Sequence, residues 1–357
     1  MDYFSGHTYF IVKLSLLQAK IIYNRKSNTV KGDGFMQMTL ILYESNYGFT
    51  EMVAKNLSLI LGPAKCCRAS EFKGDGNGYD TIVICTPVYL EGANSKIVEY
   101  VSKNSDWIKQ KKVILICTCL AVNMVHQYLK PLYAVLGESI VLQSAIGGRL
   151  ILNKLNSRDH DIIRQFCNKT GFSFKDYDLF DMEKFIELAL HIKTIKDSSK
   201  KPVEPELLKK YIAEFITNHN TCTLATGQGD NLRATPIEYI YKDNYLYFLS
   251  EGGQKFANIL LNPNVSVCIY DAFKSMNELG GMQITGTAEI LDIKSEEYSS
   301  ILAYKGLNPD KISSLPVALN LIKVRTSKFE FLWSEFSKLG YSTKQILRIP
   351  YECSKSE

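Results

Sequence analysis

The chain has 357 residues, of which 46% are hydrophobic and 22% are charged. This balance is typical of a globular protein of about two domains, and it excludes a disordered, collagen-like or coiled-coil chain. The net charge of +5 (42 basic minus 37 acidic residues) is too small by itself to indicate nucleic-acid binding. The nine cysteines include no Cys-x-x-Cys pair, so we predict no metal site and expect reduced thiols in a cytoplasmic protein.

Residues 1–37 precede the first domain-like pattern. We expect them to be a disordered extension, or to lie upstream of the true start of the protein. Their longest apolar stretch, residues 11–23, contains two lysines and is shorter than the roughly 20 residues that a membrane span needs. The sequence therefore predicts no membrane span here, and we assign no chemistry to this extension.

Apolar runs and helical patterns alternate over residues 38–174. The runs at 39–43, 81–85, 112–117 and 139–144 are each followed by a loop and by a helical pattern that begins near residue 50, 95, 123 or 158. Alternating strands and helices of these lengths predict an α/β, doubly wound parallel sheet that is covered on both faces.

The loops at the carboxyl ends of such strands hold the ligands. The first loop contains no dinucleotide or triphosphate signature, but its hydroxyls, its glycine and its helix start can bind a monophosphate through backbone N–H groups. The alternative is an ordinary strand-to-helix turn capped by Thr50. The residues of this loop are Ser45, Asn46, Tyr47, Gly48, Phe49 and Thr50. A second loop consists of Thr86, Pro87, Val88 and Tyr89, and a third spans residues 119–123.

This segment resembles the flavodoxin family, whose phosphate loop has the pattern hydroxyl-x-hydroxyl-Gly-x-hydroxyl. Ser45, Gly48 and Thr50 match the pattern, whereas Tyr47 replaces the middle hydroxyl. The resemblance implies an FMN with its phosphate in the first loop and its ring between the other two, where Tyr89 either stacks on the flavin or is a partly exposed loop tyrosine. Residues 147–150 (Gly-Gly-Arg-Leu) resemble the segment that follows the last strand in flavodoxin-type protoporphyrinogen oxidases.

A connection follows over residues 175–205. Residues 181–195 have a helical pattern, and residues 197–205 have the polar, proline-containing composition of an interdomain linker. We therefore expect a domain boundary near residue 200.

The pattern changes to period two in residues 206–350. After a helix over 207–219, strands are predicted at 221–226, 233–241, 245–250, 265–270 and 283–291, with a last pair at 318–325 and 328–333. A short helix over 253–261 interrupts them. Antiparallel strands of this number and length predict a small barrel.

This region resembles the flavin-binding split barrel of the pyridoxamine 5′-phosphate oxidase-like family. The similarity lies in four blocks, at residues 232–236, 247–255, 257–265 and 281–288. It implies an FMN site that is completed by the second subunit of a homodimer. The site residues it implies are Arg233, Ala234, Thr235, Ser250, Lys255 and Gln283.

The residue types agree with this resemblance. Lys255 and Arg233 are suited to a phosphate, and Ser250 adds a neutral donor for phosphate or ribityl oxygens. Backbone atoms of Ala234 and Thr235 are expected at the edge of the flavin ring. The alternatives are a solvated charge for Lys255 and an outward-facing strand residue for Gln283.

These observations predict an FMN-dependent oxidoreductase, with one FMN in each domain, that passes electrons between the flavodoxin-like domain and the split barrel. Its small-molecule substrate and its electron donor are not identified by the sequence, and neither are catalytic side chains, because flavin performs the redox chemistry itself. One alternative is an electron carrier or redox sensor without turnover. Another is a protein that handles haem or porphyrin.

Overall fold

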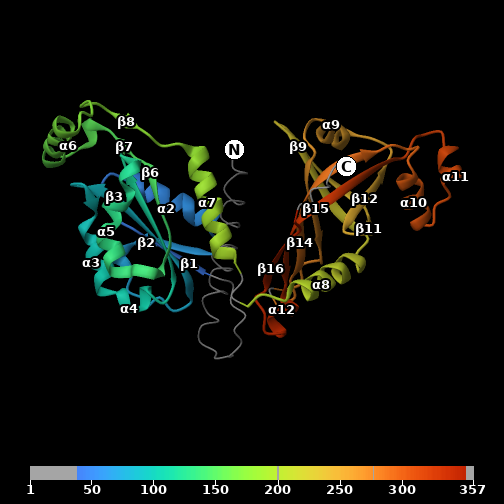
Figure 1. Cartoon of the computed structure of the whole chain (residues 1–357), viewed down its shortest axis with the longest axis horizontal. Coiled ribbons are helices and arrows are strands. Elements are labelled where there is room, and N and C mark those ends of the chain that lie inside the picture. Colours follow the sequence, from blue (N-terminus) through green and yellow to red (C-terminus); the bar gives the residue numbers. More distant parts are fainter. Residues whose placement is uncertain (1–37, 199–200, 276, 351–357) are drawn as a thin grey trace, which may run out of the picture. The chain divides into compact units, whose positions relative to one another are not determined.

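A computed structural model describes residues 38–198, 201–275 and 277–350. The extension expected over residues 1–37 lies outside the described residues, as do residues 199 and 200 of the expected linker. The described chain forms a parallel sheet covered by helices and then an antiparallel curled sheet with short helices (Figure 1), which confirms the predicted fold class. Within this described part, no helix is both long enough and apolar enough to cross a membrane.

The first sheet has the strand order β2-β1-β3-β5-β6, and every pairing along this path is parallel. This order is that of flavodoxin-like doubly wound folds. The strands are β1 (Met38–Tyr43), β2 (Ala64–Arg68), β3 (Tyr79–Tyr89), β5 (Lys112–Cys119) and β6 (Ile140–Gly147). The short β4 (Gly92–Ala93) pairs antiparallel with the end of β3.

Helices cover both faces of this sheet. On one face, Leu57 of α2 and Phe185 of α7 pack in a core with Ile41 of β1. On the other face, Leu132 of α5 packs in a core with Leu40 of β1. Because neighbouring strand residues point to opposite faces, the continuous apolar runs supply both cores. The helices are α2 (Phe49–Ile60), α3 (Ser95–Lys103), α4 (Ser105–Ile108), α5 (Val125–Leu136), α6 (Ser157–Thr170) and α7 (Met182–Asp197).

Residues 149–181, which we call the cap segment, lie between β6 and α7. They contain α6 and a two-strand ladder of β7 (Arg149–Leu150) and β8 (Tyr177–Asp178), where the Arg149 guanidinium pairs with the Asp178 carboxylate at 2.8 Å. The residue that follows the ladder packs tightly on the end of β6, because a Cβ at Gly147 would lie 2.0 Å from the Leu179 carbonyl oxygen. Glycine is therefore required there by the close approach of two backbones.

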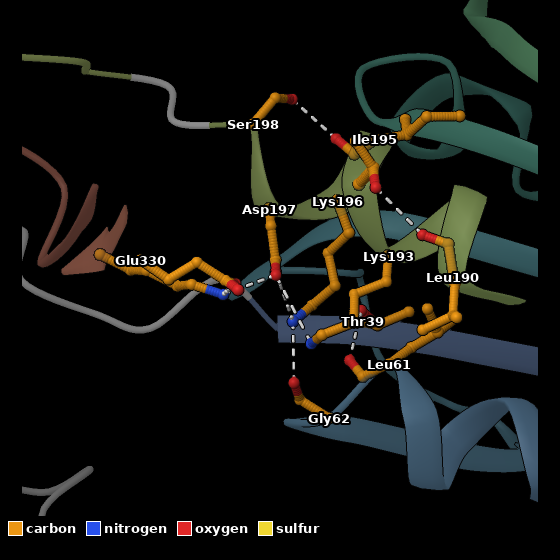
Figure 2. Close-up of polar contacts among 12 residues, drawn as sticks. Thr39, Leu61, Gly62, Leu190, Lys193, Ile195, Lys196, Asp197, Ser198 and Glu330 are labelled. Carbon is orange, nitrogen blue, oxygen red and sulfur yellow. Dashed lines mark hydrogen bonds and ion pairs between the residues drawn. The ribbon is translucent and has the colours of Figure 1, made fainter. Parts of the chain in front are cut away.

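The last turn of α7 is tied to the end of α2. Figure 2 shows the Lys196 ammonium donating a hydrogen bond to the Gly62 carbonyl at 2.9 Å, and the Thr39 hydroxyl donating to the Leu61 carbonyl. Burial lowers the pKa of Lys196, and the neighbouring Asp197 carboxylate partly offsets this effect. Helix α7, which the sequence places in the connection, thus packs on the first sheet.

The second sheet has the order β10-β9-β13-β14-β15-β12-β11, with β16 paired to β15, and all of its pairings are antiparallel. Its ends, β10 and β11, do not pair with each other, so the curled sheet is a half-barrel. The strands are β9 (Thr221–Gln228), β10 (Asn231–Glu238), β11 (Ile240–Lys242), β12 (Tyr245–Ser250), β13 (Asn264–Tyr270), β14 (Gly280–Leu291), β15 (Asn320–Trp333) and β16 (Lys344–Arg348).

Two details of the predicted strands are wrong. The expected last pair is one continuous strand, β15, because the chain absorbs an extra residue in a bulge opposite Thr285 and Gly286 instead of turning. The expected strand 233–241 is divided into β10 and β11. The predicted turn at 242–244 is confirmed: Asp243 and Asn244 have φ values of 51° and 66°, as a two-residue hairpin turn requires.

Helices pack on both faces of the half-barrel, because Tyr247 points to the opposite face of β12 from Leu246 and Phe248 of the main core. Ile212 and Phe215 of α8 pack in its main core with Phe331 of β15, and a smaller core joins α10 to β12 through Tyr298 and Tyr247. The helices of this part are α8 (Pro205–Thr217), α9 (Gln254–Leu261), α10 (Glu296–Tyr304), α11 (Pro309–Ser313) and α12 (Ser334–Lys338).

Candidate functional site

A cavity of about 1130 Å³ lies at the carboxyl ends of the strands of the first sheet. All six residues of the first predicted loop line it, as do residues 119–121 of the third. Pro87, Val88 and Tyr89 of the second predicted loop also line it, but the prediction of a loop there is wrong, because these residues are the end of β3, which continues in pairing with β5 and β4. Thr86 does not line the cavity. Its side chain is buried, and its hydroxyl accepts a hydrogen bond from the Asn94 N–H at 2.9 Å. The structure therefore brings the three predicted segments together at one cavity. Thr86 stabilises the second segment through its buried hydrogen bond and does not reach the cavity.

The first loop is held in shape by its own polar groups. Gly48, at the start of α2, has a left-handed φ of 84° and donates its N–H to the Ser45 hydroxyl at 3.0 Å. The Thr50 hydroxyl is buried and lies 2.7 Å from the Thr118 hydroxyl. Because no side chain caps the N-terminus of α2, backbone N–H groups are the donors that this loop offers to an anion.

Tyr47 points to the cap segment. Its hydroxyl lies 2.5 Å from the Asp159 carboxylate and accepts a hydrogen bond from the Asn156 amide nitrogen at 3.0 Å. Burial and this hydrogen bond to Asp159 raise the pKa of Tyr47, so the phenol stays protonated and donates to the carboxylate. The residue that departs from the flavodoxin pattern thus connects the loop to the start of α6.

Arg68 is not among the predicted site residues, but its side chain contacts and stabilises the first loop. It is the last residue of β2 and donates to the Ser45 carbonyl at 3.0 Å. Its guanidinium also pairs with Glu44 at 3.5 Å and with Glu51 at 3.3 Å. The guanidinium charge is therefore paired with carboxylates of the protein itself. The loop contains no lysine or arginine.

Tyr89 is a half-buried phenol in the cavity wall. Burial raises its pKa to about 12, so this side chain is uncharged over the physiological pH range. The chain turns directly after it, with positive φ values at Leu90 and Glu91. A neutral aromatic side chain in this position can pack against a flat ring.

In the half-barrel, Lys255 lies in the first turn of α9 and is 8% exposed. Its ammonium donates to the Gly252 carbonyl at 2.5 Å. Burial and the nearby Arg233 cation both lower the pKa of Lys255. Among residues 38–198, 201–275 and 277–350, no carboxylate forms an ion pair with either cation. Two neighbouring cations without a carboxylate partner are suited to an anion.

Neutral donors lie beside this cation pair. The Ser250 hydroxyl donates to the Gly252 carbonyl at 3.2 Å and accepts from the Gly252 N–H at 3.4 Å, and Gly253 precedes α9 without a side-chain cap. Arg233 is opposite Thr226 in the β9–β10 ladder, and Thr226 accepts a hydrogen bond from Asn258 of α9. The predicted residues Arg233, Ser250 and Lys255 thus gather at one end of the half-barrel.

Gln283 lies elsewhere. Its neighbours Met282 and Ile284 are buried in the core, so the alternation along β14 directs Gln283 to the outer face of the sheet. Along β10, Ala234 likewise points to the opposite face of the sheet from its neighbours Arg233 and Thr235. Within a single chain, Gln283 therefore does not lie on the same face of the sheet as the group around Lys255.

Comparison with known families defines the class of each domain. Residues 40–176 match the model described as a flavodoxin domain, and residues 208–332 match the one described as pyridoxamine 5′-phosphate oxidase. The chain thus carries a flavodoxin-like domain followed by a pyridoxamine 5′-phosphate oxidase-like domain, as the sequence predicts. No curated protein sequence matches the chain.

Several solved structures resemble parts of the chain. HutZ, the haem storage protein of Vibrio cholerae, is 19% identical with a TM-score of 0.30, over 34% of this chain and 90% of HutZ. Campylobacter jejuni ChuZ is 16% identical with a TM-score of 0.34, over 49% of this chain and 74% of ChuZ. An FAD-binding protein of Mesorhizobium loti is 18% identical with a TM-score of 0.27, over 34% and 90% of the two chains.

Proposed function

We propose that this chain is an FMN-dependent oxidoreductase that holds one FMN in each domain and passes electrons between them to or from a small substrate at the split barrel. The observation that carries the proposal is that each of the two domains of a flavin-binding type contains a group suited to bind an anion. One is the loop around Gly48, and the other is the pair of Lys255 and Arg233.

In the flavodoxin-like domain, we assign the FMN phosphate to the backbone N–H groups of residues 46–50 other than Gly48, whose N–H is donated to the Ser45 hydroxyl. The hydroxyl pair of Thr50 and Thr118 keeps the first and third loops together. Tyr89 and the third loop then form the walls of the ring site, and the neutral state of Tyr89 adds no charge beside the ring.

In the split barrel, we assign the phosphate to Lys255 and Arg233, with Ser250 as a neutral donor. A phosphate dianion would relieve the repulsion between the two cations. Because Gln283 and Ala234 face the other side of the sheet, we propose that they contribute to the flavin site of a second copy, in a homodimer that forms through the split barrel.

Bound FMN supplies hydride and single-electron chemistry, and the protein sets its access and potential. In this proposal, backbone N–H groups bind the phosphate in the first domain, and the side chains of Lys255 and Arg233 bind it in the second. Covalent linkage raises the effective concentration of one site for the other, so electron exchange between the domains does not depend on an encounter between two proteins.

Turnover tests this proposal. The FMN-loaded full-length chain is reduced anaerobically with NADH, NADPH or a ferredoxin system and mixed with quinone or nitroaromatic acceptors. We expect saturable acceptor reduction that is lost when either phosphate site is disabled. Reduction without saturation, or activity that survives the loss of one site, would support a carrier or sensor and contradict the two-site oxidoreductase.

A further inference from the structure

The cavity of the flavodoxin-like domain is larger than one cofactor needs. Its volume of about 1130 Å³ exceeds the range of roughly 300–1,000 Å³ that is typical of pockets for one ligand. The three predicted loops line one side of it. The cap segment lines another part of the wall, through Leu155, Ile162, Ile163 and Phe166 among others.

The apolar side of α6 faces this cavity. Only Cys167 is buried in the 14-residue helix, whereas Ile162, Ile163 and Phe166 are half-buried and line the cavity. An amphipathic helix normally packs its apolar side into a core. Here that side is opposite an open volume, so it is available to the apolar body of a ligand.

The charged residues of the lining are mostly basic. Lys96, Lys154, Arg158 and Lys169 line the cavity, and none of them forms an ion pair with another described residue. The acidic lining residues are Glu91 and Asp159, and Asp159 accepts the Tyr47 hydroxyl. This excess of positive charge beside apolar side chains suits a ligand that has both an anionic group and an apolar body.

We propose that the cap-segment side of this cavity is a second binding site, which holds an organic anion with an apolar body beside the flavin. The inference rests on the proposed function in one respect, since that function names flavin as the neighbour. Contact between the two molecules would make the organic anion the electron partner of the first domain.

Two fluorescent probes of similar size test the site on the FMN-loaded full-length chain: the anion 1-anilinonaphthalene-8-sulfonate and the uncharged N-phenyl-1-naphthylamine. The double variant Arg158→Gln, Lys169→Gln removes two cavity charges. The control Arg164→Gln, Lys175→Gln removes two charges from the same segment that do not line the cavity. We expect the first double variant to bind the anionic probe about tenfold more weakly and the neutral probe with unchanged affinity. We expect the control variant to bind both probes with unchanged affinity.

Phe166→Ala provides a second, charge-independent variant, which we expect to weaken both probes. Equal affinities of the anionic probe for the two double variants would overturn the proposal. So would displacement of FMN by the probe, or loss of FMN from the Arg158 and Lys169 variant, because the charges would then belong to the cofactor site. A chain without FMN in this domain that still shows the expected probe pattern would contradict the proposed function and retain the organic-anion site.

Discussion

The two proposed phosphate sites obtain their positive charge in different ways. The loop around Gly48 contains no basic residue, and the nearby Arg68 is engaged with Glu44 and Glu51. The split barrel instead places Lys255 beside Arg233 without a carboxylate partner among the described residues. The first site depends on backbone direction, and the second on side-chain charge. The two sites should therefore respond differently to mutation and to pH.

The largest effect is expected for Lys255→Glu. It replaces a buried cation beside Arg233 with an anion, so one attraction to the phosphate is lost and one repulsion is gained. At short range each of these is worth a few kcal/mol, and we expect FMN affinity of the split barrel to fall about a thousandfold. Isothermal titration of the chain would check this, with occupancy of the flavodoxin-like domain unchanged. An unaltered second site would remove the phosphate role of Lys255.

Asn46→Asp addresses the loop site with a nearly isosteric change. Asn46 is exposed and lines the cavity, so the substitution adds a charge without removing a buried contact. Repulsion of the phosphate should weaken FMN binding to the first domain about a hundredfold. Flavin release during gel filtration would measure it, with Asn168→Asp as a control, because Asn168 is exposed and does not line the cavity. Undiminished occupancy would indicate that the phosphate does not lie at this loop.

The two sites should also differ in pH dependence. The pKa of Lys255 is lowered from 10.5 by burial and by Arg233, so the ammonium loses its proton below pH 10.5 and its charge is absent above the lowered pKa. FMN affinity of the split barrel should therefore fall as pH rises through that value, by up to about tenfold per pH unit. The loop around Gly48 contains no lysine, so the FMN affinity of the first domain should not show this break, the fall in affinity above the pKa of Lys255.

Lys255→Arg is the matched control, because arginine stays protonated throughout this range. It should remove the break and retain binding at neutral pH. A break that persists in the arginine variant would assign the titration to another group.

The smallest effect is expected for Tyr47→Phe, which removes the hydrogen bonds to Asp159 and Asn156. Partly exposed hydrogen bonds to a charged group contribute about 1 kcal/mol, so FMN should bind about fivefold more weakly, with faster proteolysis of residues 149–181. Asp159→Asn keeps an acceptor for the hydroxyl and should change both readouts less. Identical behaviour of Tyr47→Phe and the unmodified chain would show that Tyr47 does not hold the cap segment.

Much of this architecture can be predicted from the sequence because it depends on local patterns. The continuous apolar runs at 39–43 and 112–117 predict buried parallel strands, and period two after residue 220 predicts the antiparallel sheet. The strand β2 is not predicted, since its five residues, Ala-Lys-Cys-Cys-Arg, have the mixed character of an edge strand. With β2 unrecognised, the role of Arg68 beneath the first loop could not be foreseen.

The candidate sites also contain some features that the sequence predicts and others that it does not. The grouping of Lys255 with Arg233 follows from motifs, and the outward direction of Gln283 follows from the alternation around Met282 and Ile284. The partner of Tyr47 could not be derived, because Asn156 and Asp159 are more than a hundred residues away. Their position depends on how the cap segment folds back over the loop, and no local pattern encodes that return.

Native mass spectrometry of the full-length chain, saturated with FMN, tests the central claim most directly. Two FMN molecules per chain are expected in the unmodified protein, and one in each of Asn46→Asp and Lys255→Glu, with both sites vacant in the double variant. A single FMN that survives both substitutions, or no FMN at saturation, would contradict the account.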